Sequence, residues 1–138
     1  MRYIGLDLGT KTLGVAVSDK LGIIASFYKT YFFDNENYNS LVTIVKGLMD
    51  EFNTDKIVLG LPKNMNNSLG FASERSMNFK KILDKELNVD VILEDERLSS
   101  VEANNALISS DISRKKRKGK VDSVAASIIL QRYLDRSK

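Results

Sequence analysis

The chain has 138 residues, carries 21 Lys and Arg against 18 Asp and Glu, and contains neither cysteine nor histidine. Its length suits one domain, spanning residues 1–138, that can bury its own core. The lack of cysteine excludes disulfides and thiolate metal sites, and the lack of histidine excludes the commonest general base and every imidazole ligand. Any catalysis must therefore use carboxylates, lysines, hydroxyls or a metal held by oxygen ligands.

The sequence also bears on the compartment. It has no run of about 18 apolar residues, the length that a membrane span requires. Its N-terminus alternates apolar residues with Gly, Asp, Thr and Lys, unlike a signal peptide. Together with the absence of cysteine, this predicts a cytoplasmic protein with no membrane partner.

The first predicted strand, Tyr3 to Leu8, contains an acid where acids are disfavoured. With a period of two, Asp7 shares a face with Gly5, which we expect to leave open space beside the carboxylate. An unpaired buried carboxylate is costly, so Asp7 should have a cation, a hydrogen-bond donor or a metal as its partner. The alternative is an edge strand in which Asp7 faces water.

The rest of the chain alternates strand and helix patterns. Two further strands joined by a short turn complete an antiparallel meander, and helix and strand patterns then alternate. A capping box predicts a helix from about Ser100, and a basic loop precedes the last helix. The predicted elements after the first strand are strands at Leu13 to Ser18 and Ile23 to Tyr31, a helix at Leu41 to Phe52, a strand at Ile57 to Leu61, a helix at Ala72 to Leu87, a strand at Val89 to Leu93, the helix from Ser100, and a helix from about Asp122 to Leu134.

These elements predict an α/β fold: a mixed five-stranded sheet, with a three-strand antiparallel meander, two parallel strands and helices on both faces. In such sheets, sites form at the carboxyl ends of the parallel strands. Asp7, the segment Pro62 to Asn64 and the segment Glu94 to Glu96 all lie at such ends.

Three separated acids could converge there: Asp7, either Asp95 or Glu96, and Asp122. Oxygen ligands with open positions suit Mg²⁺ or Mn²⁺, and one or two such ions, about 4 Å apart if paired, can activate water against a phosphodiester without an imidazole. Asp122 could instead be a helix N-cap, and Glu96 could instead form a surface ion pair with Arg97.

Most of the positive charge lies in one short segment. Six of the seven residues from 114 to 120 are basic, whereas the net charge of the whole chain is only +3. Such a block is either a solvated loop or a contact for a nucleic-acid backbone. The basic residues are Arg114, Lys115, Lys116, Arg117, Lys118 and Lys120.

Four blocks of the sequence resemble the signature blocks of the YqgF family. These are Gly5 to Lys11 with Gly14 to Asp19, Gly60 to Met65, Asp95 to Ala103, and Lys120 to Ala126. The family comprises RuvC-like proteins described as Holliday junction resolvases or as pre-16S rRNA nucleases. The resemblance implies an RNase H-like fold, a bacterial cytoplasmic protein, metal-dependent cleavage of nucleic acid and a role in maturing the 5′ end of 16S rRNA.

By position, the resemblance assigns the catalytic and metal-binding acids to Asp7, Glu96 and Asp122, with Asp95 as an alternative to its neighbour. The expected substrate is structured RNA such as precursor rRNA, or branched DNA, bound by a monomer or a homodimer. Resolution of four-way DNA junctions, non-catalytic RNA binding in ribosome assembly, and a module of an actin-like kinase remain as alternatives. The residues expected to contact nucleic acid are Lys11, Lys63, Asn64, Arg97 and the six basic residues between positions 114 and 120.

Overall fold

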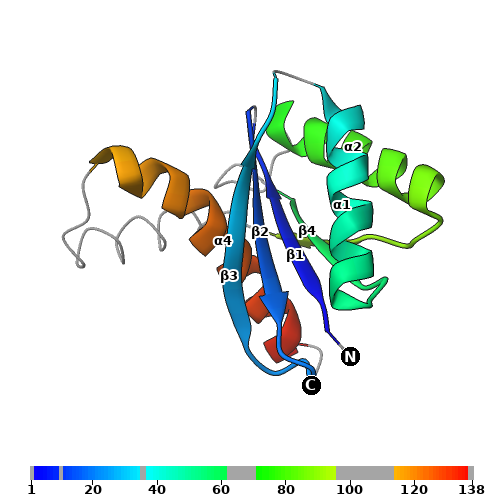
Figure 1. The fold of residues 1–138 in the computed structure, drawn as a ribbon, viewed down its shortest axis with the longest axis vertical. Helices are drawn as coiled ribbons and strands as arrows, with labels where there is room; N and C mark the ends of the chain where they lie inside the picture. The colour runs from blue at the N-terminus through cyan, green and yellow to red at the C-terminus, as the bar shows by residue number, and fades with distance from the viewer. Residues whose placement is uncertain (1, 10, 35–36, 62–70, 96–113, 137–138) are drawn as a thin grey trace.

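The structure is a computed structural model that describes residues 2–9, 11–34, 37–61, 71–95 and 114–136, with residues 71, 72, 95 and 114–124 described by their backbone alone. Figure 1 shows how strands and helices follow one another along the chain. Their bounds are β1 (Ile4–Leu8), β2 (Thr12–Ser18), β3 (Ala25–Phe32), α1 (Tyr38–Phe52), β4 (Ile57–Leu61), α2 (Phe71–Leu87), β5 (Ile92–Asp95) and α4 (Arg114–Arg136).

The strands form one five-stranded sheet in the order β3-β2-β1-β4-β5. The pairs β1–β2 and β2–β3 are antiparallel, as short turns allow, whereas β1–β4 and β4–β5 are parallel. The parallel pairs require crossovers, which α1 and α2 provide. The predicted mixed sheet of a meander and two parallel strands is therefore confirmed.

Strand β1 lies at the centre of the sheet, and all five of its residues are buried. This excludes the edge-strand interpretation of Asp7. On one face, Ile4, Leu6 and Leu8 pack against the apolar sides of α1 and α2, where Phe79 and Leu83 are fully buried. Burial of each such side chain contributes roughly 1.5–3 kcal/mol to stability.

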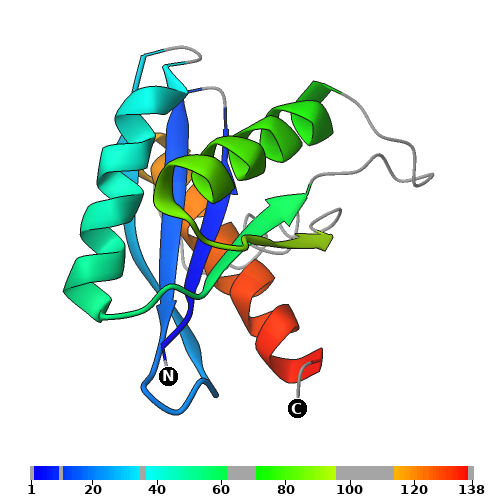
Figure 2. The same ribbon diagram turned by 90° about the vertical axis from the view of Figure 1, so that its right-hand side faces the viewer.

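Helix α4 covers the opposite face of the sheet, as Figure 2 shows. Its buried residues Ala126, Ile129 and Leu130 pack against Ala16 and Val58 of the sheet. Helices therefore cover both faces, as the sequence predicted. In the described part of the chain, no helix combines the length and apolar character needed to cross a bilayer.

The role predicted for Gly5 is wrong. A Cβ added at Gly5 would lie 2.8 Å from Leu130 Cβ and 3.1 Å from the Ala126 carbonyl oxygen. Glycine therefore permits the close approach of α4 to β1, and it leaves no open space beside the acid.

The predicted basic loop is also wrong, because residues 114–120 form the first turns of α4. Lysine and arginine are good helix formers, and one glycine such as Gly119 costs only about 1 kcal/mol in a helix. Repulsion between exposed like charges costs only a few tenths of a kcal/mol per pair. Asp122 consequently lies inside the helix, so its interpretation as an N-cap is wrong too.

Two strands begin later than predicted, because an aspartate side chain hydrogen-bonds to the backbone just before each of them. Asp84 Oδ1 accepts a hydrogen bond of 2.9 Å from the Val91 N–H, and β5 starts at Ile92. Asp19 Oδ1 accepts hydrogen bonds from the N–H groups of residues 23 and 24 at 2.7 and 3.1 Å, and β3 starts at Ala25. These two N–H donors hold the pKa of Asp19 below its usual value.

We expect Gly5→Ala to destabilise the fold by about 1–3 kcal/mol, because the new methyl group must displace α4 from β1. Urea denaturation followed by circular dichroism measures this change. Gly47→Ala is the matched control, because Gly47 lies in α1 and an added Cβ there meets nothing within 4 Å. That substitution should stabilise the protein by roughly 0.5–1 kcal/mol. Equal unfolding midpoints for the two variants would contradict the role assigned to Gly5.

Candidate active site

Asp7 lies near the carboxyl end of the central strand, on the sheet face that α4 covers, because it follows Gly5 by two residues. The residue is only 9% exposed. Asp7 takes part in a hydrogen bond, ion pair or other electrostatic interaction.

Glycines occupy the positions on both sides of Asp7 in the sheet. Asp7 pairs with Gly14 of β2, and the parallel register of β1 with β4 brings Gly60 to its other side, one step beyond the Leu6–Leu59 pair. No side chain from either neighbouring strand therefore rises beside the carboxylate. Gly14 and Gly60 therefore flank Asp7 without side chains of their own.

The role of these two glycines was not predicted from the sequence. The available signal was a glycine inside each of two otherwise apolar strands, which often marks a close approach of a ligand or another backbone. Only the pairing register shows that the two glycines flank the same acid.

Asp122 lies on α4, the helix that packs against the sheet face on which Asp7 lies. The rings of Tyr3 and Tyr133 lie 5.7 Å apart, and two residues further along β1 the Gly5 position meets Leu130 and Ala126. Asp122 lies four residues, about one helical turn, before Ala126 on α4.

Glu94 shares the α4 face with Asp7, but an arginine already binds it. The β4–β5 register pairs Gly60 with Glu94, so Glu94 lies two strands from Asp7, about 10 Å across the sheet. Its side chain is 5% exposed, and its Oε2 lies 2.6 Å from Arg136 Nη2. Arg136 Nη1 also donates a hydrogen bond of 2.8 Å to Glu94 Oε1. This ion pair connects the end of α4 to β5, just before the predicted acids Asp95 and Glu96.

The other predicted site residues are distributed as follows. Asp95 ends β5 opposite Leu61, and Lys11 is exposed in the connection between β1 and β2. The six basic residues lie on the first turns of α4, which project past the β3 edge of the sheet in Figure 1. Four predicted residues lie outside the described part of the chain: Glu96, Lys63, Asn64 and Arg97.

The donor chemistry around Asp7 fits a hard divalent cation. Carboxylate oxygens are the ligands that Mg²⁺ and Mn²⁺ prefer, and the flanking glycines place no side chain beside Asp7. Within the described ranges, no group of three or more acids forms a complete metal cage.

Comparison with known proteins identifies the relatives of this chain. The chain matches the family described as "RuvX: Holliday junction resolvase" over residues 1–136. A protein of Geobacillus sp. (strain WCH70) is 50% identical over 135 residues, which cover 98% of each chain. A protein of Clostridium beijerinckii is 48% identical over 135 residues, which cover 98% of this chain and 96% of that one. Both relatives carry the name "Putative pre-16S rRNA nuclease".

Two solved structures share the fold. RuvC of Thermus thermophilus, in complex with a Holliday junction substrate, aligns with a TM-score of 0.58 at 15% identity, covering 99% of this chain and 95% of that one. The fowlpox virus Holliday junction resolvase aligns with a TM-score of 0.55 at 21% identity, covering 99% of both chains. At these identities the likeness concerns the fold alone.

By fold and by sequence relatives, the protein is a nuclease of the RuvC-like, RNase H-like class. Within that class, the chain belongs to the RuvX family, which confirms the resemblance seen in its four sequence blocks.

We expect Arg136→Ala to lower the free energy of unfolding by about 1–3 kcal/mol, because it leaves the Glu94 carboxylate buried without this partner. The value lies below that of a fully buried pair because the Arg136 side chain is 63% exposed. A double-mutant cycle with Glu94→Gln, measured by urea denaturation, should show that the two substitutions are coupled. Additive effects would mean that the ion pair does not fasten α4 to β5.

Proposed function

We propose that the protein is a metal-dependent endonuclease in which Asp7, Glu96 and Asp122 hold one or two Mg²⁺ or Mn²⁺ ions, with Asp95 as the alternative to Glu96. The observation that carries this proposal is the position of Asp7, a buried acid flanked by two glycines beneath the helix that bears Asp122. When bound, the metal would supply Lewis-acid activation of water and would stabilise negative charge on the phosphate.

The chain's own residues would place the substrate and hold the cation. Carboxylates must do this work because the chain contains no histidine. Gly14 and Gly60 would let a phosphodiester approach Asp7 closely. Lys11, Lys63, Asn64, Arg97 and the basic turns of α4 would contact the nucleic-acid backbone, which positions the substrate without reading its sequence.

We propose precursor 16S rRNA as the substrate, with cleavage that matures its 5′ end in the cytoplasm. Relatives that are about half identical to this chain along nearly their whole length carry the name "Putative pre-16S rRNA nuclease", and this name supports the proposal. A four-way DNA junction is the second candidate, because the family description and the RuvC-like fold favour it. Two symmetric incisions in a junction would require a homodimer, whereas a monomer would suffice to cleave rRNA. A non-catalytic RNA-binding factor is the outcome to expect if no cleavage is found.

We expect Asp7→Asn to reduce metal-dependent cleavage by at least about 100-fold, because the amide keeps the shape of the side chain but removes the charge that binds the cation. Labelled precursor rRNA and a four-way DNA junction should be tested side by side, with Mg²⁺, with Mn²⁺ and with the metal chelated.

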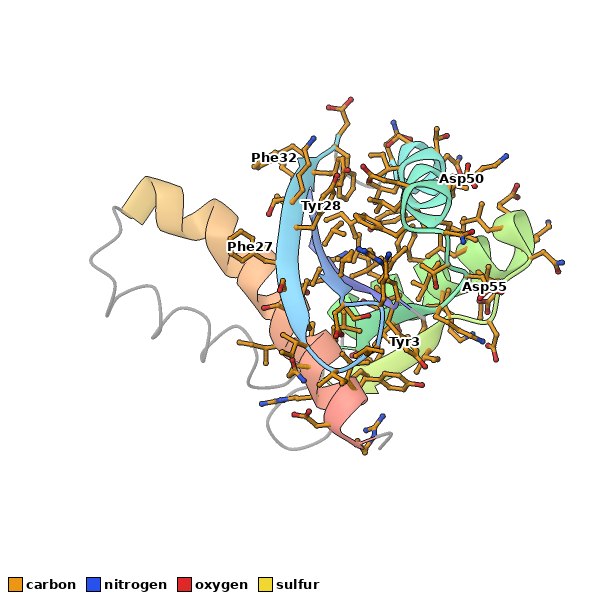
Figure 3. All side chains as sticks on the ribbon, turned by 60° about the horizontal axis from the view of Figure 1, so that its bottom comes forward. Tyr3, Phe27, Tyr28, Phe32, Asp50 and Asp55 are labelled. Carbon is orange, nitrogen blue, oxygen red and sulfur yellow. The ribbon has the colours of Figure 1, made fainter. Side chains whose placement is uncertain are left out.

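Asp50→Asn is the matched control for Asp7→Asn. Asp50 is an exposed acid of α1, on the opposite side of the sheet from α4, and Figure 3 shows its position. The control should cleave normally. Undiminished cleavage by Asp7→Asn in a folded sample would refute the assignment of Asp7.

We expect a triple substitution of Lys115, Lys116 and Lys118 by Gln to weaken RNA binding and to flatten its salt dependence. Each lost phosphate contact should reduce the slope of log K against log salt by about 0.7–0.9. The control is the triple substitution of Lys46, Lys81 and Lys85 by Gln, because these exposed lysines lie on α1 and α2, on the other side of the sheet. If both triple variants showed the same slope, the first turns of α4 would not be part of the interface.

A further inference from the structure

The exposed apolar side chains of the described residues gather on β3 and on the turn before it. Phe32 is the most exposed aromatic residue among them, at 74%, and Figure 3 shows it at one end of β3. The others are Leu21, Ile23, Ile24, Phe27 and Tyr28.

The neighbouring aromatic residues are held by other parts of the fold. The Tyr28 hydroxyl donates to Glu51 at 3.1 Å, and its ring packs edge-on against Phe52 at 5.2 Å. Phe33 turns inward, where its ring lies 6.0 Å from Tyr38. Phe32 thus presents its ring to solvent next to the inward-facing Phe33.

The sheet register places Phe32 close to the candidate site. Phe32 pairs with Thr12, and Thr30, two residues earlier, pairs with Gly14, the partner of Asp7. Residues two apart share a face, so Phe32 and Asp7 lie on the same side of the sheet. Phe32 lies two strands from Asp7 across the sheet and two residues further along the strand direction, which corresponds to about 12 Å between their Cα atoms.

Positively charged segments lie near the end of β3 that bears Phe32. The Phe33 N–H donates a hydrogen bond of 3.0 Å to the Lys11 carbonyl oxygen, so the backbone of the exposed Lys11 lies beside this end of β3. The first turns of α4, with six cations in seven residues, project past the β3 edge in Figure 1. An exposed aromatic ring beside cations is the combination that binds unpaired nucleic acid, because bases stack on the ring while phosphates meet the charges.

We propose that Phe32 is a stacking site for an unpaired nucleobase of the substrate, a few nucleotides from the bond held at Asp7. This inference rests on the proposed nuclease function and narrows the substrate to one with a single-stranded or frayed segment next to the cleaved bond. Lys11 contacts a phosphate of the same segment.

An exposed edge strand can also pair with the same strand of a second copy of the chain, but two features of β3 oppose such pairing. Lys29 lies in the middle of the strand, and the β2–β3 register shifts between Val15 and Ala16, opposite Tyr28. A charge and a bulge on an edge strand both oppose pairing with another strand.

The chain contains no tryptophan, so Phe32→Trp introduces a single fluorophore at the proposed stacking site. Titration with an unstructured oligoribonucleotide, with the metal chelated to prevent cleavage, should quench this fluorescence saturably. The matched control is Leu21→Trp, because Leu21 is 78% exposed in the turn at the other end of β3. Its fluorescence should not change.

A binding assay completes the test. Phe32→Ala should weaken binding of the oligoribonucleotide by about 5- to 100-fold, the range found when a stacking residue is truncated, whereas Phe32→Tyr should bind like the parent protein. Binding of a fully paired RNA duplex should be the same for all three proteins, because a duplex offers no unpaired base.

Three results would overturn the inference: equal quenching at positions 32 and 21, unchanged binding by Phe32→Ala, or a Phe32→Trp signal that follows protein concentration without RNA, which would indicate self-association. Cleavage assays of Asp7→Asn test the nuclease proposal separately. Quenching at position 32 together with undiminished cleavage by Asp7→Asn would refute that proposal and leave the stacking site in place.

Discussion

The close contact between helix α4 and strand β1 is the constraint on which the rest of the structure depends. A Cβ added at Gly5 would lie only 2.8 Å from Leu130 Cβ, and only glycine avoids this steric clash. The contact buries the second face of the central strand, and it holds α4, the helix that bears Asp122, against the strand that bears Asp7. Disturbing it would therefore change both stability and the arrangement of the acids, although Gly5 itself touches no substrate.

Different elements of the fold form the carboxylate site and its surroundings. The central strand supplies the buried acid Asp7, and the neighbouring strands supply glycines in place of side chains. The ion pair between Arg136 and Glu94 fastens the far end of α4 to β5, so the same helix is held at both ends of its contact with the sheet. The basic turns of α4 and Phe32 both lie at the β3 side of the sheet.

Much of the fold could be predicted from the sequence, because strand and helix periodicities are local. The strand Ile57–Leu61 was predicted with its observed bounds, and helix α1 was predicted within three residues at its start. The errors arose where a distant or competing interaction decides the outcome. Asp84 and Asp19 extend turns through side-chain hydrogen bonds, which moves the starts of β5 and β3. The basic segment continues a helix whose later turns are anchored on the sheet, whereas charge alone favoured a solvated loop.

By itself, the sequence limited the chemistry open to this protein, since a chain without histidine or cysteine must rely on carboxylates, lysines, hydroxyls or a metal held by oxygen ligands. It also determined the family, through four blocks of residues along the chain. Only the tertiary structure decided which residues surround Asp7, because the pairing register brings Gly14 and Gly60 to its two sides from strands far apart in sequence. It likewise decided that Gly5 serves packing and that Phe32 faces solvent on the Asp7 side, since both depend on contacts that no local pattern encodes.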